Sequence, residues 1–168
     1  MSIICGMLSP TDGDAFVGTK SVAHDPLAIR KSLSVCFQQN ILYDELTVWE
    51  HLKLVHDLKT SLGIKAIDEE MWIHKLQHFG LEEKRDALSK TLSGGQKRKL
   101  SLVLALMDTS RVVLLDEPTA GMDLKARVDT WDALRKAVNH RAVILTTHSM
   151  QEAQALCENI GIVTEGKL

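Results

Sequence analysis

The pattern of apolar and polar residues predicts helices and buried strands that alternate along the chain. Continuous apolar runs at Val112–Leu115 and Ala142–Thr147 predict strands buried on both faces, as in a parallel sheet. Leu33–Phe37 predicts a further strand. Between them, apolar residues recur at helical spacing, namely Leu100, Val103, Leu104 and Met107. Alternating strands and helices of this kind are typical of the α/β class.

Four more helices and a last strand follow from the same patterns. Thr47 and Glu50 have the spacing of a capping box, and the helix that follows is expected to turn Leu52, Val55 and Leu58 inward. A second helix is predicted at about 68–79, ending at Gly80. A third has Val128, Trp131, Leu134 and Val138 on one face. A fourth, at 150–157, begins after Ser149, which forms a capping box with Glu152, and residues 160–163 predict the last strand.

Two polar clusters stand at the ends of these elements. Asp116 and Glu117 directly follow the strand at 112–115, so their carboxylates are expected at the carboxyl edge of the sheet, where α/β folds bind ligands. Ser93, Gly94 and Gly95 precede the helix at 100–107, and glycines there let backbone N–H groups approach an anion. Taken alone, each cluster could equally be a solvated strand end or an ordinary helix cap.

Composition narrows the class of protein. The chain has 168 residues, 45% of them hydrophobic and 25% charged, which suits one globular α/β domain. A net charge of −2 gives no basic surface, so no nucleic-acid partner is expected. No apolar run approaches the roughly 20 residues that span a bilayer. Cys5, Cys36 and Cys157 lack metal or redox spacing and are expected to be small core residues.

The string from Leu92 to Asp123 resembles the ATP-binding cassette (ABC) ATPases. LSGGQ at 92–96 matches the signature motif of that family, VVLLDEP at 112–118 matches Walker B, and AGMD at 120–123 matches the D-loop. The resemblance implies an α/β fold of the P-loop NTPase (RecA-like) class with an inserted α-helical subdomain. It divides the chain into a catalytic-core part at 1–38, a helical subdomain at 39–108 and a second core part at 109–168.

Two further motifs belong to the same resemblance. Gln38, at the end of a strand, matches the Q-loop, although Phe37 stands where a proline is often found. Outside this context a glutamine after a strand is usually a solvated loop end. His148 follows Asp116 by 32 residues and matches the H-loop, although a lone histidine at a strand end is more often structural.

The resemblance also implies a role for each residue. Asp116 and Gln38 are expected to hold Mg²⁺, Glu117 to polarise the attacking water, and His148 to contact the γ-phosphate of ATP. A second set is expected to bind ATP held by a second cassette: Ser93, Gly94, Gly95, Gln96 and Asp123. The partners implied are that second cassette and the transmembrane domains of a transporter.

Within the family, the strings TLSGGQKRKLSLVLAL, LLDEPTAGMD and LTTHSMQEA look most like subfamily A, the exporters and flippases of lipids. This likeness implies ATP hydrolysis that powers transport of lipid or another hydrophobic substrate, at the cytosolic face of a membrane. Leu124 departs from the subfamily, which usually has proline there, and Gln154-Ala155 replaces its usual acidic continuation.

One family motif, the phosphate-binding P-loop G-x-x-x-x-G-K-[ST], does not occur in the sequence. Gly13–Lys20 comes near it with the last two residues reversed, but it predicts a turn, a short strand at Asp14–Val17 and a second turn. We therefore expect the N-terminal strands and the P-loop to be missing and these 168 residues alone to be inactive. Two alternatives stay open: an inactive fragment or pseudogene product, and a soluble ABC ATPase outside transport.

Overall fold

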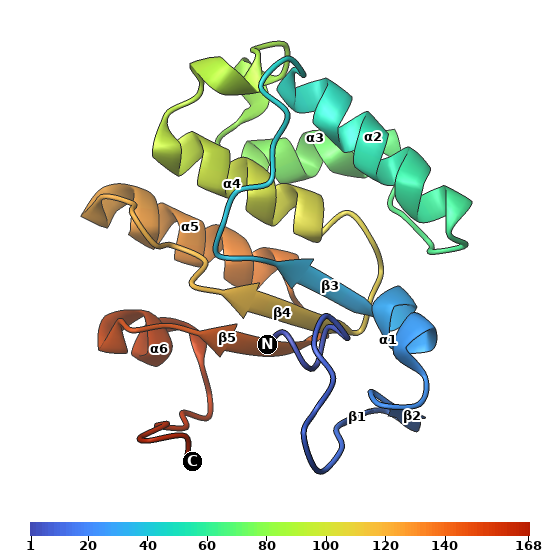
Figure 1. The fold of residues 1–168 in the computed structure, drawn as a ribbon. Helices are drawn as coiled ribbons and strands as arrows, with labels where there is room; N and C mark the ends of the chain where they lie inside the picture. The colour runs from blue at the N-terminus through green and yellow to red at the C-terminus, as the bar shows by residue number, and fades with distance from the viewer.

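Three parallel strands form the centre of the computed structural model, which describes all residues from Met1 to Leu168 (Figure 1). They are β3 (Leu33–Cys36), β4 (Val112–Asp116) and β5 (Ala142–Thr146), in the spatial order β3-β4-β5. Cys36 pairs with Leu115, and Asp116 pairs with Thr146. The three carboxyl ends therefore meet at one edge, and the predicted parallel α/β sheet is confirmed.

Helices surround this sheet in the predicted order. Their bounds are α1 (Pro26–Ser32), α2 (Val48–Ser61), α3 (Glu69–His78), α4 (Gly94–Ala105), α5 (Leu124–Ala137) and α6 (Met150–Leu156), with 3₁₀ turns at Glu82–Lys84 and Ser89–Thr91. Thr47 and Glu50 make both hydrogen bonds of the predicted capping box at the start of α2. Asp68 caps α3 in the same region, where its side chain accepts from the N–H of Met71.

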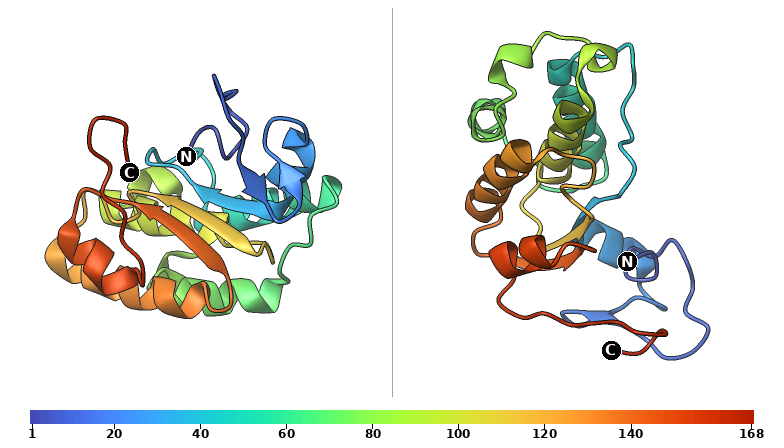
Figure 2. Two further views of the ribbon diagram at one scale, coloured as in Figure 1. Left: turned by 90° about the horizontal axis from the view of Figure 1, so that it is seen from below. Right: turned by 90° about the vertical axis from the view of Figure 1, so that its left-hand side faces the viewer.

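The sheet separates two apolar clusters, because successive side chains of a strand point to opposite faces. Val113 and Leu115 face a cluster of 19 buried residues formed with α2, α3, α4 and α5. Leu114 faces a smaller cluster with Cys5 and Ile29 of the N-terminal segment and α1. Figure 2 shows α2–α4 and the N-terminal hairpin on opposite sides of the sheet.

The free cysteines fit this packing. Cys5 and Cys36 are buried and Cys157 is half-buried, which confirms the prediction for the first two. Burial raises the pKa of the Cys36 thiol to about 11, so this thiol stays protonated and unreactive at neutral pH.

Residues 13–20 form a hairpin. β1 (Phe16–Val17) pairs with β2 (Lys20–Ser21) across the turn at Gly18-Thr19. Gly13 and Gly18 both have positive φ angles, which a turn of this kind requires. The predicted order of turn, strand and turn is confirmed, although the strand begins at Phe16 and not at Asp14. The segment has neither the preceding buried strand nor the following helix of a phosphate-binding loop.

Two predictions about burial are wrong. β5 was expected to be buried, yet Ala142, Val143 and Ile144 are exposed. The reason is its position: β5 pairs only with β4, and the N-terminal cluster on the second face covers β3 and β4 instead. Leu58 was expected to face inward from α2 together with Leu52. Leu52 is fully buried, but Leu58 is exposed.

Residues 160–163 do not form the predicted last strand. The segment makes no ladder, and the nearest pairing is a single bridge between Thr164 and Lys167. A strand needs a partner for its backbone N–H and C=O groups. Here the apolar residues Ile162 and Val163 are each 67% exposed, so the apolar run alone was a misleading signal.

Candidate functional site

The loops after β3, β4 and β5 bring four of the predicted site residues to one edge of the sheet. Gln38 lies two residues beyond β3, Glu117 follows β4 immediately, and His148 lies two residues beyond β5. Because the strands are parallel and in register, their arrowheads point the same way and these loops are neighbours (Figure 1). Asp116, the last residue of β4, completes the group.

The carboxylate of Glu117 is the meeting point. His148 Nδ1 lies 3.1 Å from Glu117 Oε2, and Gln38 Nε2 lies 3.5 Å from the same oxygen, which is long for a hydrogen bond. The His148 side chain is 77% exposed and that of Glu117 is 26% exposed, so solvent reaches both. A water or an anion can therefore approach this carboxylate from outside.

The backbone of Glu117 is held in an uncommon conformation. Its φ angle is 47°, in the left-handed region that residues with a Cβ rarely adopt. Its N–H donates to the carbonyl of Thr146 at 3.0 Å, which continues the β4–β5 ladder by one bond. The side chain of Glu117 is thereby turned toward the loops after the two neighbouring strands.

Asp116 lies beside this carboxylate and has a different partner. Its Oδ1 accepts a hydrogen bond from the Thr146 hydroxyl on the adjacent strand. No other hydrogen bond to the Asp116 side chain occurs, so its second oxygen stays available. The edge thus presents two carboxylates and the amide of Gln38, all of them oxygen donors of the kind that a hard cation prefers.

The start of α4 forms a second surface. The Ser93 hydroxyl accepts from the N–H of Gln96 at 3.2 Å, and Gln96 Oε1 accepts from the N–H of Ser93 at 2.9 Å. Gln96 therefore serves its own helix as a capping box. A Cβ added to Gly94 or Gly95 would meet no heavy atom within 4 Å, so the backbone there is open to an outside group.

Asp123, the remaining predicted residue, is the N-cap of α5. Its carboxylate accepts from the N–H of Ala126 at 2.9 Å. No hydrogen bond or ion pair joins Asp123 or the residues at the start of α4 to Glu117. The structure thus brings Gln38, Asp116, Glu117 and His148 together and leaves the signature residues and Asp123 on separate surfaces.

Sequence reasoning missed Arg98, which joins these regions. Its side chain is 2% exposed, and every nitrogen of its guanidinium donates to a backbone carbonyl beside the site. The acceptors after β3 are Phe37 O (2.5 Å) and Gln38 O (3.0 Å), and those at the end of β4 are Asp116 O (2.6 Å), Glu117 O (2.9 Å) and Pro118 O (3.0 Å). A signal was present, because Arg98 precedes Leu102 and Ala105 by four and seven residues and so falls on an apolar helix face.

Glu152 differs from its predicted role at the start of α6. Ser149 caps the helix as predicted, accepting from the N–H of Glu152. The Glu152 carboxylate is buried elsewhere and accepts from Thr119 Oγ1 at 2.5 Å and Trp131 Nε1 at 3.2 Å. It does not complete a capping box, because these two donors hold it against the loop after β4.

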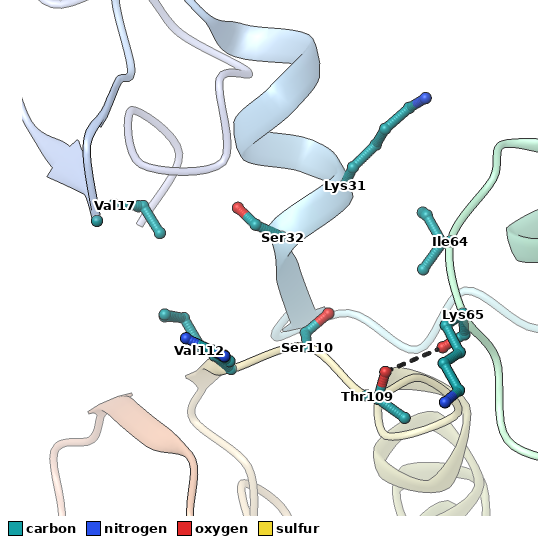
Figure 3. Close-up of a pocket in the computed structure, with 10 residues that line it drawn as sticks. Val17, Lys31, Ser32, Ile64, Lys65, Thr109, Ser110 and Val112 are labelled. Atoms are coloured by element: carbon teal, nitrogen blue, oxygen red, sulfur yellow. Dashed lines mark hydrogen bonds between the residues drawn. The ribbon is translucent and has the colours of Figure 1, made fainter.

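One cavity lies away from the site. It measures about 400 Å³ and opens beside Val112, the first residue of β4, at the opposite end of the strand from Asp116 (Figure 3). None of the predicted site residues lines it. The candidate site lies at the other end of the strand, where the His148 side chain is 77% exposed.

No helix combines the length and the apolar character needed to cross a bilayer. No group of three or more His, Cys, Asp or Glu side chains is arranged to hold a metal ion.

Comparison with known proteins gives consistent matches. The sequence model of the family described as "ABC transporter" matches residues 1–120. The chain is 45% identical, over its whole length, to the phospholipid-transporting ATPase ABCA3 of Rattus norvegicus, of which it covers 10%. It is 43% identical over its whole length to the human ATP-binding cassette sub-family A member 2, of which it covers 7%. The chain thus spans about a tenth or less of these relatives.

Solved structures resemble the fold. An ATP-binding subunit of an ABC transporter superposes with a TM-score of 0.76 at 24% identity, over 94% of this chain and 65% of that one. A dimeric ATP-binding cassette in a post-hydrolysis state, bound to ADP and Pi, gives 0.77 at 24% identity over 92% and 70%. At this identity the likeness establishes the fold, an ABC ATPase core.

Proposed function

Because this chain belongs to the ABC transporter family and is similar to its subfamily A, we propose that it forms part of a cassette that hydrolyses ATP to drive transport. The observation that carries the proposal is the meeting of Gln38 and His148 at one oxygen of Glu117. Three loops far apart in sequence supply these groups. A site that positions water beside a phosphate needs polar side chains that converge in this way.

Hydrolysis of ATP depends on positioning and charge neutralisation more than on covalent chemistry. In our proposal Glu117 orients the attacking water and accepts its proton. Gln38 donates to Glu117 Oε2 and holds that oxygen toward the water. His148, which is largely exposed, contacts the γ-phosphate and stabilises the charge that develops on it.

The donor set at this edge fits Mg²⁺. Mg²⁺ in nucleotide sites takes one or two protein oxygens and completes its shell with phosphates and water. The free carboxylate oxygen of Asp116 and the amide oxygen of Gln38 are groups of that kind, and the lack of a larger ligand cluster agrees with such a shell. Bound there with ATP, the ion would neutralise phosphate charge.

We assign the start of α4 to the ATP of a second cassette. The open backbone at Gly94 and Gly95, with Ser93 as N-cap of a 12-residue helix, suits a phosphate that approaches from outside. Gln96 supports this end through its capping box, and Asp123 lies at a second exposed helix start. Residues 39–108 would act as the unit that presents α4, and 1–38 with 109–168 as the catalytic core.

For the whole protein we propose phospholipid or another hydrophobic cargo, transmembrane domains as partners, and a position at the cytosolic face of a membrane. The support is the likeness to a protein named as a phospholipid-transporting ATPase. The expectation that these 168 residues alone do not turn over ATP stays a prediction. Two alternatives stay open, an inactive fragment and a soluble ABC ATPase. One experiment distinguishes them from the proposal, because each predicts a different result.

That experiment measures ATP turnover by the full-length protein in lipid nanodiscs, with and without added phospholipid. Glu117→Gln should lower turnover by about 10²–10⁴-fold, because an amide cannot accept the proton of the water. Binding of a fluorescent ATP analogue should be retained. Turnover without phospholipid stimulation would favour a role outside lipid transport. Turnover that survives Glu117→Gln would remove Glu117 from the proposed role.

A further inference from the structure

One buried side chain, that of Arg98, makes hydrogen bonds to both the loop after β3 and the loop after β4. Arg98 binds the backbone carbonyls of Phe37 and Gln38 in the first loop, and those of Asp116, Glu117 and Pro118 in the second. It is an arginine with no carboxylate within ion-pair distance, so its charge is balanced by carbonyl dipoles alone. If the guanidinium is removed, the Glu117 carbonyl keeps the N–H of Ala120 at 3.2 Å and the Phe37 carbonyl keeps the Cys36 thiol at 3.8 Å, but neither donor links the two loops.

The acceptors include the two residues whose placement matters most at the candidate site. Glu117 has a left-handed backbone, a conformation that persists only when the surrounding structure holds it. The carbonyls before, at and after this position are all bound by Arg98. The Gln38 carbonyl is bound by the same guanidinium, so the distance between Glu117 and Gln38 depends on it.

Arg98 also belongs to the helix that carries the second surface. It stands five residues after the N-cap Ser93 in α4, on the side that faces the sheet. A helix of 12 residues moves as one body, so a displacement of its start is passed to both loops through Arg98. No other side chain of α4 makes a hydrogen bond to the loop after β4, whereas Ser101 Oγ also donates to Asn40 Oδ1 in the loop after β3 at 3.1 Å.

We propose that Arg98 is a positioning residue that places Glu117 and Gln38 and couples them to the helix start at Ser93–Gly95. This inference rests on the proposed function, since the coupling matters only if Glu117 orients water. Arg98 touches neither nucleotide nor water in this account. It acts through the backbone of the two loops.

The geometry needs a guanidinium and not merely a cation. Arginine offers five N–H donors in a fixed planar fork, whereas lysine offers three from one nitrogen. A lysine at 98 therefore cannot span the carbonyls of Phe37 and Pro118 together. Arg98→Lys is the informative variant. Lys99→Met is its matched control, because it removes a charge from the same helix at a side chain that makes no hydrogen bond to these loops.

The first measurement is steady-state kinetics on the full-length protein. Arg98→Lys should lower kcat about 10²-fold, the usual effect of displacing a reacting group by about 1 Å, and leave KM for ATP within about threefold. Lys99→Met should behave as wild type. In a Glu117→Gln background, Arg98→Lys should cause no further loss, because it acts through that carboxylate. An unchanged kcat in a folded Arg98→Lys protein overturns the proposal, as does a full additional loss in the double variant.

The second measurement is independent of ATP turnover. Hydrogen exchange followed by mass spectrometry should show faster exchange at residues 37–40 and 117–120 in Arg98→Lys, and no change in Lys99→Met. If wild type hydrolyses no ATP, the proposed function fails, and exchange alone still decides whether Arg98 holds the loops. Arg98→Gln serves as the second variant. Unchanged exchange in both, or loss of folding in both, overturns the proposal.

Discussion

Lys75 of α3 is a buried lysine beside a second cation. Its side chain is only 7% exposed. Burial in the first place, and the charge of Arg141 in the second, lower the pKa of Lys75 to about 8, and Asp108 only partly opposes them. The folded chain therefore binds fewer protons than the unfolded chain between about pH 8 and pH 10.5. Stability should rise as the pH increases through that window.

Lys75→Met should therefore stabilise the protein at pH 7, by roughly 1–2 kcal/mol, because methionine fills similar space without a charge to bury. The gain should shrink at pH 9, where Lys75 itself is largely neutral. Urea unfolding of both proteins at the two pH values measures the difference. Exposed Lys53, changed to Met, should give a small effect without pH dependence. An equal gain at pH 7 and pH 9 would refute the burial argument.

Single residues at the site differed in how far the sequence could predict them. Asp116 and Glu117 directly follow one apolar run and His148 stands at the end of another predicted strand, so the edge of the sheet that they share could be predicted from these runs. The burial of Arg98 could be predicted from its place on an apolar helix face, but its partners could not, because its five backbone acceptors belong to distant segments and carry no residue signature. The chemical role of each residue stays a prediction that the experiments above test.

At the level of elements, α4 is buried along its apolar face and is open to solvent at its N-terminus. Leu100, Val103 and Leu104 are buried as the helical spacing predicts, while Gly94 at the first turn faces open space. In the folded chain Gly94 has no neighbour that excludes a side chain and no positive φ angle. A glycine at this position therefore meets no steric or backbone requirement of the fold that alanine would fail.

Gly94→Ala should therefore raise the free energy of unfolding slightly, by up to about 1 kcal/mol, because alanine is the better helix former. ATP turnover by the full-length protein should fall about tenfold or more, since the new methyl group keeps the backbone from an approaching phosphate. Gly80→Ala is the matched control with the opposite pattern. Its φ angle of 66° makes alanine destabilising, while turnover per folded molecule should be kept. Turnover unchanged in Gly94→Ala would argue against a ligand at this helix start.

Elements with strong periodicity and caps were predictable, and elements that depend on a neighbour were not. α2 and α3 begin at side chains that satisfy their own first N–H groups, which is local chemistry. The burial of β5 and the existence of a strand at 160–163 depend on whether another strand pairs with them. That information lies in the arrangement of the sheet and not in the apolar run.

For the whole molecule, the unpaired edge at β5 is the exposed flank of the fold. β5 pairs only with β4, and both Val143 and Ile144 are solvent-accessible. An apolar strand with free N–H and C=O groups is a template for pairing with another chain. We expect these 168 residues in isolation to self-associate through this edge.

Ile144→Lys should slow that association, because a charge on an open strand disfavours edge-to-edge pairing. The cost in stability should be small, within about 0.5 kcal/mol, since Ile144 is already half in solvent. Light scattering of the isolated chain over time measures the effect. Lys136→Glu is the control, because it changes an exposed charge on α5, away from the edge of the sheet. Equal aggregation in all three proteins would place the sticky surface elsewhere.

Because Glu117 has a left-handed backbone, selection for stability and selection for ATP turnover should favour different residues at this position. A glycine at this position would relieve a conformational cost of about 1–2 kcal/mol. A library sorted only for thermal resistance should thus drift toward glycine or asparagine at 117, and one sorted for turnover should keep glutamate. Drift of that kind would mark, without any ligand bound, a position that natural selection keeps for what it does and not for how well it folds.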